Sequence, residues 1–479
     1  MAPIPEGDSG IMGSGMRYTP AEETSQSASR DSDSRGLLAP SLHIPTRVIL
    51  PVLGSFALLI YVLFIGFLPD RLAHNESTDY SRFYRPVAEN LVTGEGLVTA
   101  DGRPAVRYPP GYPLILAGLL EVARVTEIRE TLILRLFTSL TVLATTLLVF
   151  GIAALVFDQG TALLAAALFA TYPFYLWLTK QPNSEIPFFP IFLLAMYVFL
   201  RSLHARQFTA WRGLAVGALV GLASLMRPFT VALGAVLLFA LWVSARECTV
   251  RQRMFFSVLL VLGNALVVLP WDVWAWKKTG QWMLLSTNGP PSVVDGLTFA
   301  LKEGGAGRTL TFSPEVRGLM QDVKDQSGEL QSVAAIGGFL AGKFVHDPSP
   351  VASLILLKAR RAWYANDTQS HEGWVALLQA PYLLFAAVGG TIAAGLGSGQ
   401  RRFTLIVLLV TFYFWIMTTM VLSILRYMVP AMALLMPFVS VGVISAGKAL
   451  WDDSKRRQLA AVLHGPGDRA PAFRLEPRR

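Results

Sequence analysis

The sequence is poor in charge and has almost no cysteine. Charged residues are 15% of the 479 residues and hydrophobic residues are 53%, whereas a soluble domain averages about 25% charged residues. The mean hydropathy is +0.48. The single cysteine, Cys248, excludes an internal disulfide and lies in a basic stretch with no redox or metal-binding pattern. These shortages argue against a soluble globular protein and against a disulfide-stabilised domain.

Other patterns are missing as well. A net charge of +9 would suit a nucleic-acid-binding protein, but the basic residues cluster at the ends of apolar runs, as they do in membrane proteins. The apolar runs are continuous rather than alternating, which excludes an outer-membrane β-barrel. The sequence contains no internal repeat of the transporter kind, and no stretch resembles a soluble nucleotide-binding domain.

Long apolar runs dominate the sequence. Runs of roughly 17–25 apolar residues fit helices that cross a bilayer, and the chain contains about ten of them. We therefore predict an all-α polytopic membrane protein with a transmembrane domain over residues 46–450. The predicted spans are residues 47–68, 132–157, 162–178, 186–203, 211–226, 229–245, 255–274, 374–396, 403–422 and 427–448.

Basic residues in the connections predict which side of the cell membrane (the inner membrane) is cytoplasmic. The basic connections are Arg47, residues 204–212, residues 246–253, Arg401–Arg402 and residues 455–457. This assignment makes both termini cytoplasmic. Residues 1–45 are rich in Ser, Gly, Pro and acids, and residues 451–479 are basic, so both are predicted to be disordered tails. A polar tail this long before the first span also argues against a cleaved signal peptide.

Two long connections fall on the extracytoplasmic side. They are the first outer loop, residues 69–131, and the long outer loop, residues 277–373. Gly111–Val122 is apolar but too short to span, so we expect a helix that lies at the membrane interface. Pro350–Tyr364 combines an apolar run with basic residues and an aromatic end, which predicts a second interfacial helix. The long outer loop is too short and glycine-rich to be assigned as a separate domain.

Ionisable residues near the membrane gather on the outer face. Placing such a group in the membrane costs several kcal/mol unless it is paired with an opposite charge or hydrated, so these residues are functional candidates. They are Asp79, Arg107, Lys180, Glu185, Arg227 and Arg426. Structural roles remain open for the acids, because Asp79 could cap a helix or turn and Glu185 would be favoured in a first helical turn by the helix dipole.

The cations and tyrosines also have two interpretations. Arg227, which precedes Pro228, could contact phosphate or extend to the interface as an ordinary snorkelling arginine, and the same holds for Arg426. Arg107 and Lys180 could bind lipid headgroups. The tyrosines at positions 84, 108, 112 and 427 could bind substrate or form an aromatic belt.

The outer-face motifs resemble the GT-C fold glycosyltransferases that use polyprenyl-phosphate sugars, and especially the bacterial branch similar to protein mannosyltransferases and aminoarabinose transferases. The first motifs are Asp79, Tyr84, Ala88, Asn90–Leu91, Gly94–Gly96 and Pro109–Pro113, with a second acid at Glu185. The later ones are Gly221–Pro228, Leu269–Trp271, Gly280, Ser286–Gly289, Gly296 and Arg426–Pro430. The sequence departs from many relatives at Trp274–Ala275, where they have an Arg-Asn pair.

The resemblance implies an inverting transfer from a polyprenyl-phosphate sugar to an acceptor. It implies Asp79 and Glu185 as catalytic residues, with Asp79 as the general base. It implies that cations among Arg107, Lys180, Arg227 and Arg426 hold the donor phosphate. Tyr84, Tyr108, Tyr112 and Tyr427 are the candidate substrate-binding residues. We predict no cofactor, and we assign no metal because no two carboxylates have metal-ligand spacing, although a divalent ion is compatible with this chemistry.

Two other functions compete with this interpretation. A flippase for lipid-linked sugars would place ionisable residues near the middle of interrupted spans, whereas most of these spans contain no ionisable residue near the middle. A glycan polymerase of similar build would keep the outer-face site and change the acceptor. The expected partners are a polyprenyl-phosphate sugar, an acceptor and the lipid bilayer, with no nucleic acid. The sequence names neither the sugar nor the acceptor.

Overall fold

The computed structural model describes residues 45–69, 79–301 and 312–463, with backbone alone for 452–463. The predicted N-terminal tail, apart from residue 45, lies outside the described residues, as do residues 464–479. Within the described ranges the chain is helical and contains no strand, and one isolated bridge pairs Val98 with Pro104. The predicted all-α class is confirmed.

Seven helices in the described part are long and apolar enough to cross a membrane. They are α2 (Thr46–Phe67), α6 (Glu130–Ala154), α9 (Glu185–His204), α12 (Val250–Thr279), α17 (Glu372–Leu396), α18 (Ser398–Met420) and α19 (Val429–Leu463), the last over Val429–Trp451. The pair α7 (Gln159–Ala170) and α8 (Pro173–Thr179), bent by 51°, would make an eighth span.

The two remaining predicted spans are helices, but they are shorter. They correspond to α10 (Ala210–Met226) and to the short η2 (Pro228–Thr230) with α11 (Leu233–Ser244). Every predicted span therefore coincides with a helix, whereas length and composition support seven or eight spans in the described residues rather than ten. The polytopic fold is confirmed and the count of ten remains a prediction.

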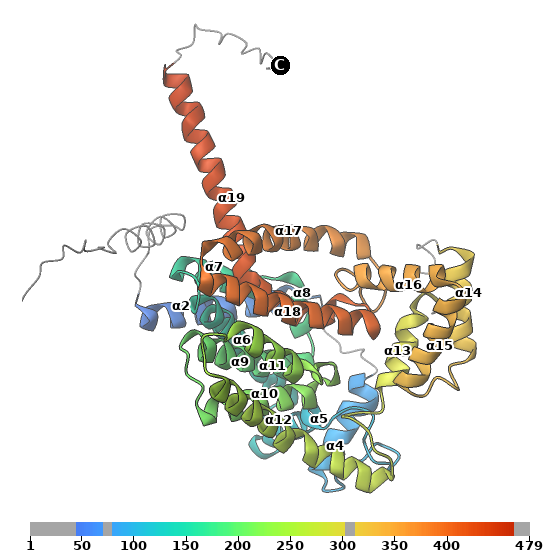
Figure 1. The fold of residues 1–479 in the computed structure, drawn as a ribbon. Helices are drawn as coiled ribbons and strands as arrows, with labels where there is room; N and C mark the ends of the chain where they lie inside the picture. The colour runs from blue at the N-terminus through green and yellow to red at the C-terminus, as the bar shows by residue number, and fades with distance from the viewer. Residues whose placement is uncertain (1–44, 70–78, 302–311, 464–479) are drawn as a thin grey trace, which may run out of the picture. The chain divides into compact units, whose positions relative to one another are not determined.

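The helices α10 and α12 pack backbone to backbone (Figure 1). A Cβ atom on Gly217 would clash with the carbonyl oxygen of Leu260, and one on Gly263 would clash with that of Leu214. Small residues allow membrane helices to approach closely, and van der Waals packing then replaces the missing hydrophobic force. This contact fixes α10, whose end carries Arg227.

The last helix is longer than the sequence predicted. The helix α19 continues to Leu463, although residues 451–479 were predicted to be disordered. The sequence Lys455–Leu463 is rich in Lys, Arg, Gln, Leu and Ala, which have high helix propensity and lose little side-chain freedom in a helix.

The first outer loop forms short helices against the bundle. They are η1 (Tyr80–Tyr84), α4 (Arg85–Val92) and α5 (Gly111–Thr126). The helix α5, which covers the predicted interfacial segment, packs against α4, α6 and α10. Its placement brings the aromatic residues of the loop close to the ends of the spanning helices.

The long outer loop forms short helices of its own. It contains α13 (Gly289–Leu297), η3 (Phe299–Leu301), α14 (Pro314–Asp325), α15 (Val333–His346) and α16 (Pro348–Arg361), drawn in yellow and orange in Figure 1. These helices have their own hydrophobic core, which includes Val316, Met320, Val323 and Leu354. The helix α16 also packs against α18. The apolar positions of α14 recur at helical spacing.

Candidate active site

Several helix ends meet at one end of the bundle. The helix α9 begins at Glu185, and α10 ends at Met226 directly before Arg227. Arg426 lies in η5 (Leu425–Tyr427), between the end of α18 and the start of α19. Three helix ends that are distant in sequence therefore bring one acid and two arginines to the same place.

The acid and the arginines form a buried ion cluster. Nη1 of Arg227 lies 2.6 Å from Oε1 of Glu185, and Nε of Arg426 lies 3.7 Å from the same oxygen. Glu185 is 5% exposed and Arg227 8%. Arg227 also donates to Oγ of Ser184 at 3.2 Å, and Nη1 of Arg426 lies 3.3 Å from Oδ2 of Asp367. Two cations thus share one buried carboxylate.

Aromatic rings line the same cluster. The Arg227 guanidinium carbon lies 4.7 Å from the centre of the Tyr427 ring and 5.2 Å from that of Phe229. Arg426 lies 5.2 Å from the Tyr427 ring. The Phe229 and Tyr427 rings are stacked, with centres 5.5 Å apart. These rings hold the guanidinium groups by cation–π attraction and keep much of the water away from them.

One arginine donor of the ion cluster has no hydrogen-bond partner. Nε of Arg426 is buried, and its 3.7 Å separation from Glu185 exceeds hydrogen-bond distance. Among the described residues no acceptor reaches this N–H. A buried unsatisfied donor calls for an explanation, and an anion bound beside the two arginines would supply the missing acceptor.

Asp79 reaches the cluster through two tyrosines. The hydroxyl of Tyr108 donates to Oδ1 of Asp79 at 2.7 Å, and the ring of Tyr108 lies 5.2 Å from that of Tyr84. Tyr84 hydrogen-bonds Ser184, the neighbour of Glu185. Burial raises the pKa values of both Tyr84 and Tyr108, so both phenols stay neutral and can donate.

The structure thus brings most of the predicted residues together. Asp79 is linked to the ion cluster through Tyr108 and Tyr84, while Arg426 and Tyr427 contact the cluster directly. Tyr112 is 3% exposed and packs edge-on against Tyr84, with ring centres 5.0 Å apart. It therefore supports the Tyr84 ring.

Two predicted cations are placed differently. Arg107 is exposed and donates from Nε to Oδ1 of Asn288 at 3.3 Å. The backbone beside it is fixed, because the amide of Thr287 donates to the carbonyl of Val106 at 3.1 Å. The ammonium of Lys180 lies 4.1 Å from the centre of the Trp177 ring. Arg107 therefore ties the first outer loop to the long outer loop.

Sequence reasoning missed Asp367 and Ser184. Asp367 lies in the loop between α16 and α17, where a charged residue in a polar sequence is ordinary. Ser184 directly precedes Glu185 and had no signal beyond that position. Both belong to the site because they contact the arginines.

The arrangement combines a carboxylate with preorganised cations. Asp79 can accept a proton, while Arg227 and Arg426 can stabilise an anion in a place largely shielded from water. Among the described residues, no group of three or more His, Cys, Asp or Glu side chains is placed to hold a metal ion. The site is suited to a reaction that develops negative charge on a phosphate.

The comparisons with known proteins agree with this chemistry in part. Residues 107–274 match the family described as dolichyl-phosphate-mannose-protein mannosyltransferase. This match includes Glu185 and Arg227 and ends before Arg426. A search of the curated proteins gives no match.

One solved structure shares the fold at low sequence identity, and others are similar to a lesser degree. The Archaeoglobus fulgidus oligosaccharyltransferase tethered with an acceptor peptide is 13% identical, with a TM-score of 0.51, and the match covers 84% of this chain and 50% of that one. A structure of the archaeal oligosaccharyltransferase AglB from Archaeoglobus fulgidus, in complex with an inhibitory peptide and a dolichol-phosphate, is 14% identical, with a TM-score of 0.47. That match covers 89% of this chain and 53% of that one. This chain therefore spans about half the length of those structures.

A third solved structure is ArnT from Cupriavidus metallidurans, bound to undecaprenyl phosphate. It is 16% identical, with a TM-score of 0.39, over 84% of this chain and 79% of that one. The resemblance predicted from the outer-face motifs is confirmed: the chain has the GT-C glycosyltransferase fold, and its residues 107–274 match the dolichyl-phosphate-mannose-protein mannosyltransferase family.

Proposed function

We propose that the chain is an inverting glycosyltransferase that transfers a sugar from a polyprenyl-phosphate donor to an acceptor at the outer face of the cell membrane. The observation that carries this proposal is the pair Arg227 and Arg426 on one buried carboxylate, which Tyr84 and Tyr108 link to Asp79. A flippase for lipid-linked sugars would also bind the phosphate, but it would not need a carboxylate base. The basic connections support a cytoplasmic location for both termini.

Asp79 is the proposed general base. The acceptor hydroxyl attacks the anomeric carbon, its proton passes to Asp79, and the bond from that carbon to the phosphate oxygen breaks. The hydrogen bond from Tyr108 holds one oxygen of the carboxylate and so fixes its direction. General-base catalysis of this kind contributes about 10²–10⁴-fold to the rate.

Arg227 and Arg426 are the proposed phosphate ligands. The leaving polyprenyl phosphate gains a negative charge as the bond breaks, so cations that are already in place stabilise the transition state more than the ground state. The unsatisfied Nε of Arg426 supplies one donor for a phosphate oxygen. Glu185 keeps the two guanidinium groups together when no phosphate is bound.

A flippase is the alternative, and one experiment separates the two. Vesicles containing the protein are incubated with polyprenyl phosphate that carries radiolabelled mannose, glucose, galactose or arabinose, together with membranes from the producing cell as the acceptor source. A glycosyltransferase releases free polyprenyl phosphate and moves the label to another molecule. Label that crosses the bilayer while remaining on the lipid would contradict the proposal and support the flippase.

A further inference from the structure

The long outer loop binds the segment that carries Arg426. This segment, residues 421–427, joins α18 to α19 and contains η5. The amide of Leu425 donates to the carbonyl of Ala365 at 2.8 Å, and Nη1 of Arg426 lies 3.3 Å from Oδ2 of Asp367. Ala365 and Asp367 both lie in the loop after α16. The position of Arg426 therefore depends on the long outer loop as well as on the spanning helices.

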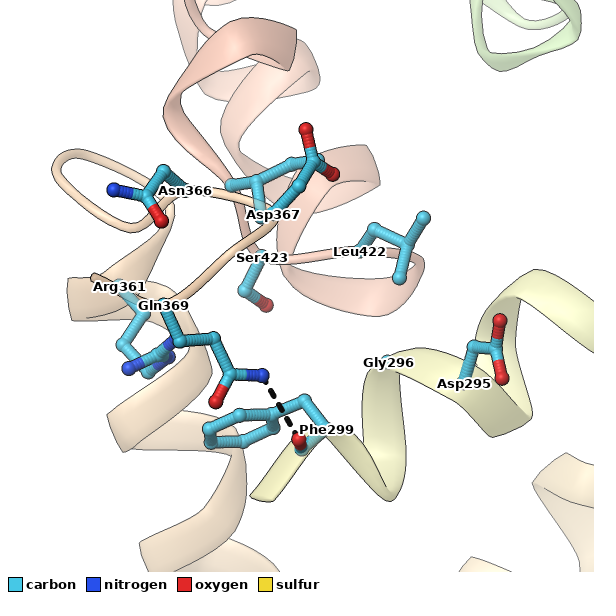
Figure 2. A pocket seen from close by; sticks show the side chains of 10 residues that line it. Asp295, Gly296, Phe299, Arg361, Asn366, Asp367, Gln369, Leu422 and Ser423 are labelled. Atoms are coloured by element: carbon cyan, nitrogen blue, oxygen red, sulfur yellow. Dashed lines mark hydrogen bonds between the residues drawn. The ribbon is translucent and has the colours of Figure 1, made fainter. Parts of the chain in front are cut away.

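The start of this segment is held from two directions. The carbonyl of Val421 accepts a hydrogen bond from Nζ of Lys358, in α16, at 3.1 Å. A Cβ atom on Gly296, in α13, would clash with the same carbonyl oxygen. Figure 2 shows the segment at Leu422 and Ser423, with α13 on one side and the loop after α16 on the other. Contacts with two helices of the long outer loop therefore fix the backbone at Val421.

Lys358 is an unusual residue to bury. It is 1% exposed, burial lowers its pKa to about 7, and among the described residues no carboxylate forms an ion pair with it. The C-terminal end of α18 favours a cation, because the helix dipole is negative there. Burying an amine is costly unless it is hydrogen-bonded, so an apolar side chain would be the better choice if the position required packing alone. The hydrogen bond to Val421 therefore distinguishes Lys358 from a packing residue.

The helix that carries Lys358 is itself bound to two spanning helices. Nε1 of Trp415, in α18, donates to the carbonyl of Ala359 at 2.8 Å. Arg361 is 2% exposed and donates to both carboxylate oxygens of Glu372, at the start of α17, at 2.6 and 2.8 Å. Lys358 therefore extends from a fixed part of α16 toward Val421.

We propose that Lys358 is a positioning residue: by binding the carbonyl of Val421, it holds residues 421–427 in the arrangement that lets Arg426 reach the donor phosphate. The inference rests on the proposed function, in which Arg426 binds this phosphate. The side chain of Arg426 has weak support of its own, because its ion pair joins an Asp367 side chain that is 57% exposed. A guanidinium displaced by about 1 Å would lose hydrogen-bond geometry with the phosphate.

The test is a double-mutant cycle on lipid binding by the full-length protein in nanodiscs. The probes are undecaprenyl phosphate and undecaprenol, which lacks the phosphate. We expect Lys358→Met to weaken binding of undecaprenyl phosphate by about 10-fold, and Arg426→Gln to weaken it by about 10- to 100-fold. In the Arg426→Gln background, Lys358→Met should add less than about twofold, because a residue that acts through Arg426 has no further effect once Arg426 is replaced. Undecaprenol binding should stay unchanged, as should all binding by the control Lys343→Met, in α15 of the same loop.

Two results would overturn the positioning role alone. They are an equal loss of affinity from Lys358→Met with and without Arg426, which a general structural role predicts, and no loss at all. Wild-type protein that binds both lipids equally, or Arg426→Gln protein that binds undecaprenyl phosphate as the wild type does, would instead overturn the phosphate site of the proposed function.

A second variant and a second measurement cover poor folding of Lys358→Met. Lys358→Gln keeps a polar group, but its side chain is too short to keep the bond to Val421. Amide hydrogen exchange of residues 421–428, measured without lipid, should be faster in Lys358→Gln than in the wild type, because the Leu425 amide is then less firmly held. Unchanged exchange in this segment would also overturn the positioning role.

Discussion

At the scale of single residues, the cations of the outer face differ in what surrounds them. Arg227 is 8% exposed and bound to Glu185 and Ser184, whereas Arg107 is exposed and contacts an amide in another loop. A buried cation cannot exchange a lost ligand for water, so its contacts with an anion are worth more than those of an exposed cation. We therefore expect the two arginines to respond differently to the same substitution.

The first prediction compares Arg227→Gln with Arg107→Gln. We expect Arg227→Gln to raise the half-saturating donor concentration by about 10- to 100-fold, because a charge-assisted contact to the phosphate is lost. Arg107→Gln should change it by less than about threefold. Activity against donor concentration measures both. Because an unpaired Glu185 would destabilise the protein, Arg227→Lys serves as the charge-preserving control, and equal profiles for all three variants would remove Arg227 from the phosphate site.

Lys358 is a second informative residue, because burial lowers its pKa to about 7. The unfolded chain keeps its lysine protonated up to about pH 10.4. Between these values the unfolded state binds one more proton than the folded state, so this group makes the free energy of unfolding rise with pH. Below pH 7 both states are protonated and the contribution is constant.

The second prediction uses Lys358→Met, which removes this titration. The difference in unfolding free energy, wild type minus variant, should rise by up to about 1.4 kcal/mol per pH unit between pH 7 and 10. Melting temperatures of both proteins in the same detergent, measured at pH 6, 7, 8 and 9, give the trend. A difference that stays constant across this range would show that Lys358 titrates normally.

Sequence reasoning found the site where residue types were unusual for their surroundings. Asp79, Glu185, Arg227 and Arg426 stood out as charges beside apolar spans, and the structure gathers them around one cluster. Asp367 did not stand out, because a charge in a long polar loop is ordinary. Its contact with Arg426 depends on the fold of the loop after α16, and no local pattern encodes such a distant contact.

At the scale of helices, the close contact between α10 and α12 positions Arg227. The two backbones touch at Gly217 and Gly263, where any side chain would collide with a carbonyl of the other helix. Both helices were predicted from the sequence, because each coincides with a long apolar run. The pairing of α10 with α12 was not predicted. An apolar helix face can pack against lipid as well as against protein, and the positions of glycines do not show which helix packs against them.

The third prediction compares two glycine-to-alanine variants. Gly217→Ala should separate α10 from α12, lower the melting temperature and reduce activity, because the added methyl group meets the Leu260 backbone. Gly118→Ala, in α5, has open space around the new methyl group. It should be neutral or raise stability by about 0.5–1 kcal/mol through helix propensity. Equal melting temperatures for the two variants would contradict the close α10–α12 contact.

At the scale of the whole molecule, the account requires one membrane orientation. Basic connections such as residues 246–253 face the cytoplasm in this orientation, and the ion cluster faces the outside. Charge bias predicted the side of every connection from composition alone. The small core of the long outer loop was not predicted, because it is built from short helices that contain no long apolar run.

The fourth prediction tests that orientation with single cysteines in a Cys248→Ser background. Asp367→Cys replaces a side chain that is 57% exposed, so it is a better reporter than the buried Glu185 position. A membrane-impermeant maleimide should label Asp367→Cys in intact cells and should label Arg251→Cys only after the membrane is opened. The reverse pattern would invert the topology and place the site in the cytoplasm.

The central claim is that the carboxylate of Asp79 drives sugar transfer from a polyprenyl-phosphate donor. The most direct measurement is the rate of free polyprenyl phosphate release by the wild type and by Asp79→Asn, reconstituted at equal amounts and supplied with saturating donor and acceptor membranes. Asparagine keeps the shape of the side chain and cannot accept the proton, so we predict a rate lower by about 10²–10⁴-fold with unchanged donor binding. Release by Asp79→Asn at a rate close to that of the wild type would contradict the account.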